Sequence, residues 1–243
     1  MITPKYIIKV GDSYTLNSGE SCTVTSVDKN LIDIIFSTGN SKTVTSGDLR
    51  NGKVRNPLFK AYLGVGFEGL GRYKIYRFGG GKSPEGKLWM DMINRCYNPK
   101  RLIKAKSYIG CEVSEDWHNF QNFADWCQNQ KGFKVLGWAL DKDILSKESK
   151  IYSPDTCLFV PKELNNFFKN KTQTISVLTR STGFQSKFYL QGFQTYSPKF
   201  ETKDEAMCWY VYKKNETLKL LIEKYKNLLD ERFLKLVNGG YYV

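Results

Sequence analysis

The sequence predicts an α+β fold, and three observations lead to that prediction. The first sixty residues contain short runs of β-branched and aromatic residues between turn formers, and the middle of the chain repeats apolar residues at helical spacing. The C-terminal part places three short strand-like runs before one long helical pattern. With 243 residues, 41% of them hydrophobic, the chain is long enough for one large domain or two to three small ones.

The N-terminal strands are expected to form a small SH3-like β-barrel over residues 1–60. Turn formers such as Gly11-Asp12 and Thr38-Gly39-Asn40 separate the strand-like runs. Four or five short strands at this spacing are typical of such a barrel, a fold that does not by itself reveal function. The runs are residues 6–10, 22–27, 32–36 and 42–45.

Residues 61–82 are rich in glycine and basic residues, and we expect a flexible basic linker there. Gly64-Val65-Gly66-Phe67-Glu68-Gly69 has the letters of a dinucleotide-binding motif. That motif requires a helix to follow it, and Leu70-Gly71-Arg72-Tyr73 does not continue as one. A basic linker of this kind can lie along nucleic-acid phosphates instead.

Three helices and a ββα unit are predicted for the centre. Ser83-Pro84 is a helix start, Ser114 with Glu115 and Asp116 is a second, and Pro161 opens a short third helix. The strand-like runs 138–140 and 157–160 are separated by a polar loop, 141–156. With the third helix they give the order strand, loop, strand, helix.

The C-terminal part is predicted to contain strands at 175–178, 184–190 and 193–196. A capping box, Thr202-Lys203-Asp204-Glu205, then starts a helix that we expect to run until Gly239-Gly240. The end of such a helix is more often a core or dimer surface than a ligand site, so a homodimer or a protein partner is possible there.

The charge distribution indicates a polyanionic partner. The net charge of +13 divides into +3 for residues 1–60, +7 for 61–110, −2 for 111–170 and +5 for 171–243. A slightly acidic middle between basic arms is typical of a protein that grips a polyanion with its flanks. A basic protein with no nucleic-acid partner is the alternative interpretation.

Cysteine usage and hydropathy indicate a cytoplasmic protein. The six cysteines lie far apart without a C-x-x-C pair, so free thiols are expected. A zinc site using Cys96, Cys111 and Cys157 is conceivable but lacks a known zinc-knuckle spacing. No window has the length and apolarity of a membrane helix, and the N-terminus lacks the apolar core of a secretory signal.

Four sequence blocks in order resemble a group of phage-encoded HNH-type (His-Me finger) endonucleases, many of them homing endonucleases. They are Trp89-x-x-Met92-x-x-Arg95-Cys96-Tyr97-Asn98-Pro99, Cys111-Glu112-Val113-x-x-x-Trp117-x-x-Phe120-x-x-Phe123, Leu140-Asp141-Lys142-Asp143-Ile144 and Tyr152-Ser153-Pro154-x-x-Cys157-x-Phe159-Val160. The resemblance implies an HNH core over 83–170. Residues 171–243, with Gly192-Phe193 and Glu205-Ala206, resemble an AP2-like DNA-binding domain, a three-stranded sheet backed by a helix.

The resemblance implies a catalytic centre at the end of the first strand of the ββα unit. Asp141 takes the metal-ligand place, Lys142 stands where the histidine belongs, and Asp143 follows. Asn165 or Asn166 would be the ligand on the helix. Oxygen ligands suit Mg²⁺ or Mn²⁺ better than zinc. Lysine between two carboxylates stays protonated, so Lys142 is expected to act as a phosphate-binding cation rather than as a base.

The histidine that such a site needs is missing from the ββα unit. His118, the one histidine of the chain, lies in the second predicted helix, where we expect an exposed helix residue. Two groups of residues are the predicted DNA contacts. The basic group is Arg72, Lys74, Arg77, Lys82, Arg95, Lys100, Arg101, Lys104 and Lys106, and the group on the AP2-like sheet is Arg180, Gln185, Lys187, Gln191 and Gln194.

Three functions remain open from the sequence. The first is an HNH-type endonuclease or nickase acting on duplex DNA with a divalent ion. The second is a DNA-binding regulator or anti-host factor that kept the nuclease scaffold and lost catalysis. The third is a protein-interaction module, against which the net charge of +13 argues.

Overall fold

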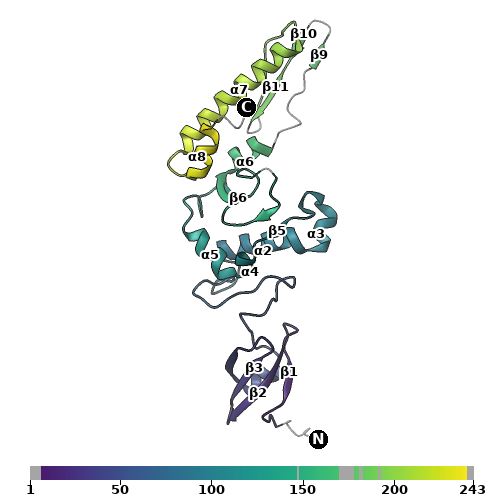
Figure 1. The fold of residues 1–243 in the computed structure, drawn as a ribbon, viewed down its shortest axis with the longest axis vertical. Helices are drawn as coiled ribbons and strands as arrows, with labels where there is room; N and C mark the ends of the chain where they lie inside the picture. Colours follow the sequence, from purple (N-terminus) through teal and green to yellow (C-terminus); the bar gives the residue numbers. More distant parts are fainter. Residues whose placement is uncertain (1–6, 147, 170–177, 181–182, 191–192, 240–243) are drawn as a thin grey trace. The chain divides into compact units, whose positions relative to one another are not determined.

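The fold is α+β (Figure 1). The computed structural model describes residues 7–146, 148–169, 178–180, 183–190 and 193–239. The chain divides into two compact units, one of residues 1–98 with 115–123 and the other of residues 99–114 with 124–243. No helix among the described residues is long and apolar enough to cross a membrane.

A four-stranded antiparallel sheet opens the first unit, in the order β1-β2-β3-β4. Its strands are β1 (Ser13–Thr15), β2 (Ser21–Asp28), β3 (Leu31–Phe36) and β4 (Ser41–Thr45). The buried side chains of β2 and β3, among them Val24, Ile32 and Ile34, form one core with Leu49 of the short helix α1 (Ser46–Arg50). Alternation of buried and exposed residues along the strands places this core on one face of the sheet.

The sheet does not close into the barrel that the sequence predicts. Closure requires the first and last strands to pair, and among the described residues β1 pairs with β2 while β4 pairs with β3. β1 has three residues, and the chain turns directly from β4 into α1, so the core is covered by a helix rather than by a returning strand. Hydrophobic residues Val27, Leu31 and Ile35 of β2 and β3 remain exposed.

Residues 61–82 form a packed loop where the sequence predicts a flexible linker. Gln121, 8% exposed, fixes the loop by donating to the carbonyls of Glu68 (3.1 Å) and Tyr73 (3.0 Å). Its carbonyl oxygen accepts from the Tyr73 amide at 3.0 Å. Gly71 packs so closely that a Cβ there would lie 2.3 Å from the Gln121 oxygen. The glycines of this loop therefore allow close packing as well as chain reversal.

The predicted helix start at Ser83 is confirmed. Helix α2 (Pro84–Tyr97) has Ser83 as N-cap, with the Gly86 amide donating to its hydroxyl at 3.0 Å. Trp89 of α2 is fully buried and donates from Nε1 to the carbonyl of Trp117 at 2.7 Å. The aromatic residues at 117, 120 and 123 are also fully buried, as their helical spacing predicts.

The second predicted helix is broken at Asn119 into α4 (Glu115–His118) and α5 (Phe120–Gln128). The break comes from a contact that is distant in sequence. The Phe67 amide donates to the His118 carbonyl at 2.9 Å, and the Phe120 amide donates to the Phe67 carbonyl at 3.0 Å. The backbone around Asn119 therefore pairs with a strand-like residue instead of continuing the helix.

The second unit begins with a basic helical segment, α3 (Pro99–Lys104) and the 3₁₀ turn η1 (Lys106–Tyr108). After it, β5 (Glu112–Val113) pairs in parallel with β7 (Ile151–Tyr152). The sequence predicts neither strand, because two residues are too few to show a period. This pairing fixes the far end of the loop that follows Asp141.

The predicted ββα unit is present. β6 (Trp138–Asp141) pairs antiparallel with β8 (Leu158–Pro161), and α6 (Lys162–Lys169) follows directly. Leu158 and Val160 of β8 form a core with Leu164, Phe167 and Phe168 of α6. The helix therefore covers the hairpin.

The C-terminal part contains linked strand pairs and two helices. β9 (Leu178–Arg180) pairs with β10 (Gly183–Gln185), and β11 (Lys187–Leu190) pairs with β12 (Phe193–Tyr196). Phe184 of β10 also forms an antiparallel bridge with Phe200, and the Ser197 amide donates to the Ser186 carbonyl at 2.9 Å, so β10 and β11 lie between β9 and the segment from β12 to Phe200. The predicted strand 175–178 lies almost wholly outside the described residues. The capping box of Thr202 and Glu205 is confirmed at the start of α7 (Lys203–Tyr225).

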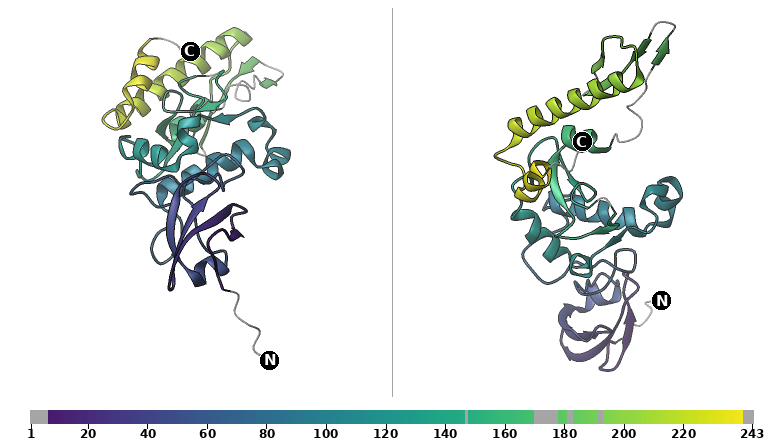
Figure 2. Two further views of the ribbon diagram at one scale, coloured as in Figure 1. Left: turned by 60° about the horizontal axis from the view of Figure 1, so that its bottom comes forward. Right: turned by 45° about the horizontal axis from the view of Figure 1, so that its top comes forward.

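The long predicted helix ends earlier than expected. Figure 2 shows α7 followed by a separate helix, α8 (Glu231–Asn238), whose N-cap is Asp230. Arg232 of α8 donates to the carbonyls of Pro154 (2.8 Å) and Cys157 (2.9 Å), and Phe233 is fully buried. A turn between the helices is needed to bring these two side chains against the ββα unit.

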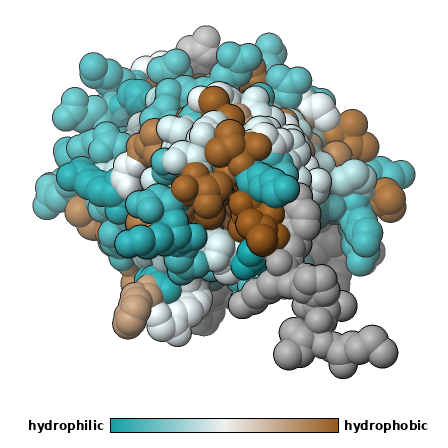
Figure 3. Space-filling view, turned by 90° about the horizontal axis from the view of Figure 1, so that it is seen from below, coloured by the Kyte–Doolittle hydropathy of each residue, from teal (hydrophilic) through white to brown (hydrophobic). Residues whose placement is uncertain are grey.

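Most of the surface shown in Figure 3 is hydrophilic, with hydrophobic residues gathered near its centre.

Candidate functional site

Asp141 lies at the end of β6, opposite Leu158 of β8. Its carboxylate oxygen Oδ1 accepts hydrogen bonds from the amides of Asp143 (2.8 Å) and Ile144 (3.0 Å), and the residue is 7% exposed. An aspartate that caps its own following turn is a common way to fix a chain reversal. Asp141 therefore holds the start of the loop, and its negative charge lies at the tip of the hairpin.

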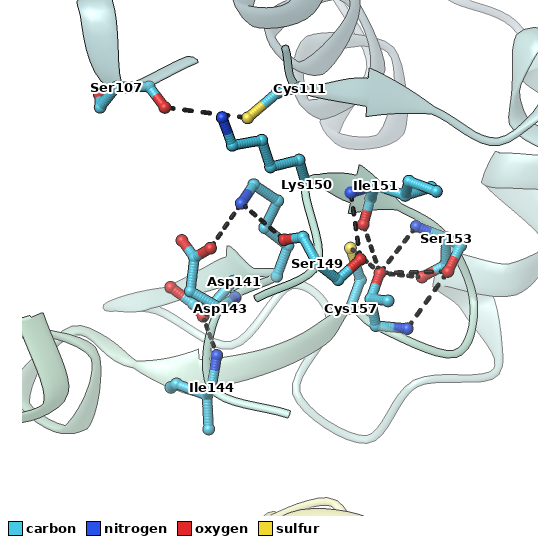
Figure 4. A network of polar contacts seen from close by, with 12 residues as sticks. Ser107, Cys111, Asp141, Asp143, Ile144, Ser149, Lys150, Ile151, Ser153 and Cys157 are labelled. Carbon is cyan, nitrogen blue, oxygen red and sulfur yellow. Dashed lines mark hydrogen bonds and ion pairs between the residues drawn. The ribbon is translucent and has the colours of Figure 1, made fainter. Parts of the chain in front are cut away.

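Lys142 is buried beside Asp141, with 6% of its surface exposed. Its Nζ lies 2.5 Å from Asp143 Oδ1 and donates to the Ser149 carbonyl at 3.4 Å, in the network drawn in Figure 4. The ammonium also lies 5.6 Å from the centre of the Tyr152 ring. Burial alone would lower the pKa of Lys142, but the hydrogen bond and charge of Asp143, with the charge of Asp141, outweigh burial and raise the pKa. Lys142 is thus held as a cation.

Asn165 and Asn166 differ in position on α6. Asn166 is exposed, whereas Asn165 is buried at 4% exposure on the side of the helix that also carries Leu164 and Phe168. The carbonyl oxygen of the Asn165 side chain has no hydrogen-bond partner among the described residues. A buried amide oxygen without a partner costs free energy and is the kind of group that a ligand satisfies. Of the two predicted helix ligands, Asn165 is the one that the structure favours.

Two buried cysteines flank this cluster. The Cys111 thiol lies 3.9 Å from the Ser107 carbonyl, and burial raises the pKa of the Cys157 thiol to about 12. Cys157 therefore stays protonated at neutral pH, as expected for a thiol buried in apolar surroundings. Within the described ranges, no three His, Cys, Asp or Glu side chains are grouped so as to hold a metal ion.

His118 lies in the first unit, on α4. Its ring is half-buried, with Nε2 3.4 Å from the Tyr97 hydroxyl and the two rings edge to face at 6.0 Å. The residue is thus engaged with α2 rather than fully exposed.

The predicted basic contacts of the first unit lie mostly on its surface. Lys74, Arg77 and Lys82 are exposed, and Arg72 is exposed with its guanidinium over the Tyr73 ring at 4.9 Å. Arg95 is different, because it is half-buried and bonded to Asp91 at 2.6 Å. Its charge is partly neutralised, so it is the weakest phosphate-binding candidate of the group.

The second unit carries the other basic contacts. Lys100, Lys104 and Lys106 of α3 and η1 are exposed, and Arg101 is half-buried. Lys150 adds to this segment, since its Nζ donates to the Ile109 carbonyl at 3.1 Å. Lys150 is distant in sequence from α3 and η1, so no sequence pattern linked it to that segment. The β5–β7 pairing brings it to residues 109–110.

The predicted DNA contacts of the C-terminal part differ in exposure and in hydrogen bonding. The Gln185 side-chain amide donates to the Ser197 carbonyl at 2.6 Å, so it makes an intramolecular hydrogen bond that stabilises the fold. Gln194 is exposed and donates to the Tyr196 hydroxyl, and Lys187 is half-buried. Arg180 belongs to β9, and Gln191 lies outside the described residues.

Comparisons with known proteins do not decide between the functions. Searches against protein-family models, curated proteins and solved structures find no significant match to this chain.

Proposed function

We propose that the chain binds duplex DNA and nicks it in a reaction that depends on a divalent metal ion, using a ββα unit of the HNH type. One observation carries the proposal. The hairpin β6–β8 is followed directly by α6, with Asp141 at the end of the first strand. On the helix lies the buried amide oxygen of Asn165, which has no hydrogen-bond partner in the part of the chain that the structure describes.

The residues present suit a magnesium or manganese ion. Asp141 supplies a carboxylate and Asn165 a buried amide oxygen that lacks a partner within the described chain. Mg²⁺ keeps several of its waters and needs only one or two protein ligands beside a phosphate. A bound ion would stabilise the leaving oxygen of the scissile phosphate and neutralise developing charge.

The remaining side chains bind and orient the phosphate. Lys142, held protonated by Asp143, supplies a fixed positive charge at the strand end. The exposed lysines of α3 and η1 belong to the same compact unit and would neutralise backbone phosphates of the duplex. In this proposal the N-terminal sheet is an SH3-like adaptor, and the linked strands β9–β12 with α7 are an AP2-like DNA-reading part.

Plasmid nicking with Mg²⁺ or Mn²⁺ tests the proposal. Asp141→Asn keeps an oxygen that can accept from the amides of Asp143 and Ile144 but removes the charge. We expect this variant to fold and to lose nicking, whereas Asp155→Asn, at an exposed carboxylate, keeps it. Nicking that persists in Asp141→Asn would move the catalytic centre elsewhere.

Salt dependence tests the binding step. Each lysine or arginine on a phosphate releases condensed counterions, so the affinity for duplex DNA should fall steeply between about 50 and 200 mM salt. A flat dependence would contradict the phosphate contacts.

A second candidate is a DNA-binding protein without catalysis on the same scaffold. It is favoured by Lys142, because a protonated lysine at the place of the HNH histidine cannot deprotonate water. DNA binding by the wild type without nicking in either metal would establish this alternative.

A further inference from the structure

A small hairpin projects from the packed loop of the first unit. Tyr76 and Lys82 form an antiparallel bridge, and the Arg77 amide donates to the Gly81 carbonyl at 2.9 Å. Gly79, Gly80 and Gly81 all have positive φ, at 82°, 102° and 76°, a conformation that L side chains rarely adopt. Three such residues in succession make a tight reversal that puts Arg77 and Phe78 directly before the turn.

The base of this hairpin is held firmly while its tip is open. Ile75 is 1% exposed, and the Ser83 amide donates to its carbonyl at 2.8 Å. A Cβ built on Gly86 of α2 would lie 2.4 Å from the Ile75 oxygen, so hairpin and helix are in close contact. At Gly79, Gly80 and Gly81, in contrast, an added Cβ would meet nothing within 4 Å.

Phe78 is fully solvent-exposed at this tip, with a relative exposure of 108%. Leaving a phenylalanine in water forgoes the favourable free energy of burying its side chain. Nothing in the hairpin backbone requires an aromatic residue there, because its hydrogen bonds come from Arg77, Gly80 and Gly81. The fold therefore does not need the Phe78 ring, which is available to contact a binding partner.

The charges around Phe78 indicate which partner. Arg77 and Lys82 lie on the two sides of the turn, and Lys74 lies close before it, all three exposed. From Gly69 to Pro84 the chain carries four basic residues and no acidic one. An apolar side chain between cations is the arrangement with which DNA-bending proteins open a base step while binding the flanking phosphates.

We propose that Phe78 is a wedge that enters a base step of bound duplex DNA, with Arg77 and Lys82 on the phosphates beside it. The inference rests on the proposed function, since it requires that the chain binds DNA. It adds a direct contact with the nucleobases from the first unit, outside the ββα unit.

Binding of 2-aminopurine duplexes by the full chain tests the wedge. The probe base is moved along one strand of a short duplex, because its fluorescence rises where stacking is lost. We expect a rise for the wild type, none for Phe78→Ala, and recovery in Phe78→Trp. Phe78→Ala should lower the affinity at least about fivefold, the lower end for loss of one aromatic stack. Leu136→Ala, at a side chain 99% exposed in the second unit, is the matched control. It should change neither the fluorescence rise nor the affinity for the duplex.

The salt dependence of DNA affinity distinguishes the contribution of the Phe78 ring from that of the charges beside it. Phe78→Ala should leave the slope of log affinity against log salt unchanged, whereas Arg77→Ala should reduce it by about one. Wild-type binding without any dependence on Phe78 would overturn the wedge and leave the proposed function standing. Absence of DNA binding by the wild type would overturn both. Phe78-dependent binding to anionic phosphatidylserine vesicles, with Phe78-independent DNA binding, would assign the ring to a membrane surface instead.

Discussion

The ammonium of Lys142 lies 2.5 Å from the Asp143 carboxylate, at the position where the proposed HNH-type site would have a histidine. The lysine side chain is 7% exposed and the aspartate side chain 61% exposed, so the pair joins a buried cation to a solvent-facing anion. The arrangement keeps the proton on Lys142, so this side chain cannot act as a general base.

Replacing Lys142 with histidine should therefore increase nicking. General-base catalysis contributes about 10²–10⁴-fold, and we expect Lys142→His to exceed Lys142→Met by about a hundredfold. The measurement is the initial rate at which supercoiled plasmid becomes open-circular in Mn²⁺. Lys142→Met removes the cation without supplying a base, so equal rates for the two variants would show that position 142 is not the base position.

The buried amide of Asn165 gives a test that does not depend on activity. Asn165→Leu, close in volume, removes the buried oxygen that lacks a partner in the described chain and should raise the metal-free stability by up to about 1–3 kcal/mol. If the oxygen is a metal ligand, the variant also loses the rise in melting temperature that Mn²⁺ gives the wild type. Asn166→Leu, on the exposed side of α6, should retain that rise. A destabilised Asn165→Leu with an intact manganese response would assign Asn165 to the fold.

Local signals in the sequence were sufficient for much of the fold. Ser83-Pro84 and the Thr202–Glu205 capping box each mark a helix start that the structure confirms, and α6 begins at Lys162, one residue after the predicted start at Pro161. The runs 138–140 and 157–160 are apolar and short, and they form the hairpin that places Asp141. In each case the residues that decide the structure lie within a few positions of it.

Contacts between distant residues account for what the sequence did not predict. The break at Asn119 depends on backbone pairing with Phe67, and the end of α7 depends on Arg232 reaching the carbonyls of Pro154 and Cys157. The depth of Asn165 in the core likewise follows from packing of α6 on the hairpin. No periodicity within one segment contains that information.

Arg232 should be a major stabilising residue of the second unit. It donates to the carbonyls of Pro154, Asp155 and Cys157 and to the Asp230 carboxylate. Because 40% of its side chain is exposed, we expect Arg232→Ala to lower the free energy of unfolding by about 1–3 kcal/mol. Urea denaturation measures this loss. Lys226→Ala, in an exposed ion pair with Glu223, should change stability by no more than about 0.5 kcal/mol. Equal effects of the two substitutions would contradict the role of Arg232.

The ion pair between Arg232 and Asp230 also predicts that the stability of the chain falls at acid pH. Burial alone would raise the pKa of Asp230, but hydrogen bonds and charge from Arg232 outweigh it and lower the pKa. A carboxyl with a lowered folded-state pKa contributes stability above its unfolded value, about 3.9, and loses it as the pH falls through the folded value. Asp230→Asn keeps an N-cap acceptor for the Arg232 amide but removes the charge.

We therefore expect Asp230→Asn to be less stable than the wild type at about pH 6, with the difference vanishing at acid pH below the lowered pKa. Urea midpoints measured across this range provide the comparison. A difference that stays constant with pH would mean that the carboxylate charge does not stabilise α8.

Gln121 should determine whether the basic loop of the first unit stays ordered. Its side chain makes three hydrogen bonds to the backbone of Glu68 and Tyr73, and it is 8% exposed. At about 1 kcal/mol for each bond, Gln121→Ala should destabilise the loop by about 2–3 kcal/mol. Amide hydrogen exchange over residues 67–74 is expected to accelerate, because the Tyr73 amide loses its acceptor. Gln128→Ala, at an exposed position of the same helix, should leave exchange in the loop unchanged. Unaltered protection in Gln121→Ala would mean that the close packing of Gly69 and Gly71, and not these hydrogen bonds, holds the loop.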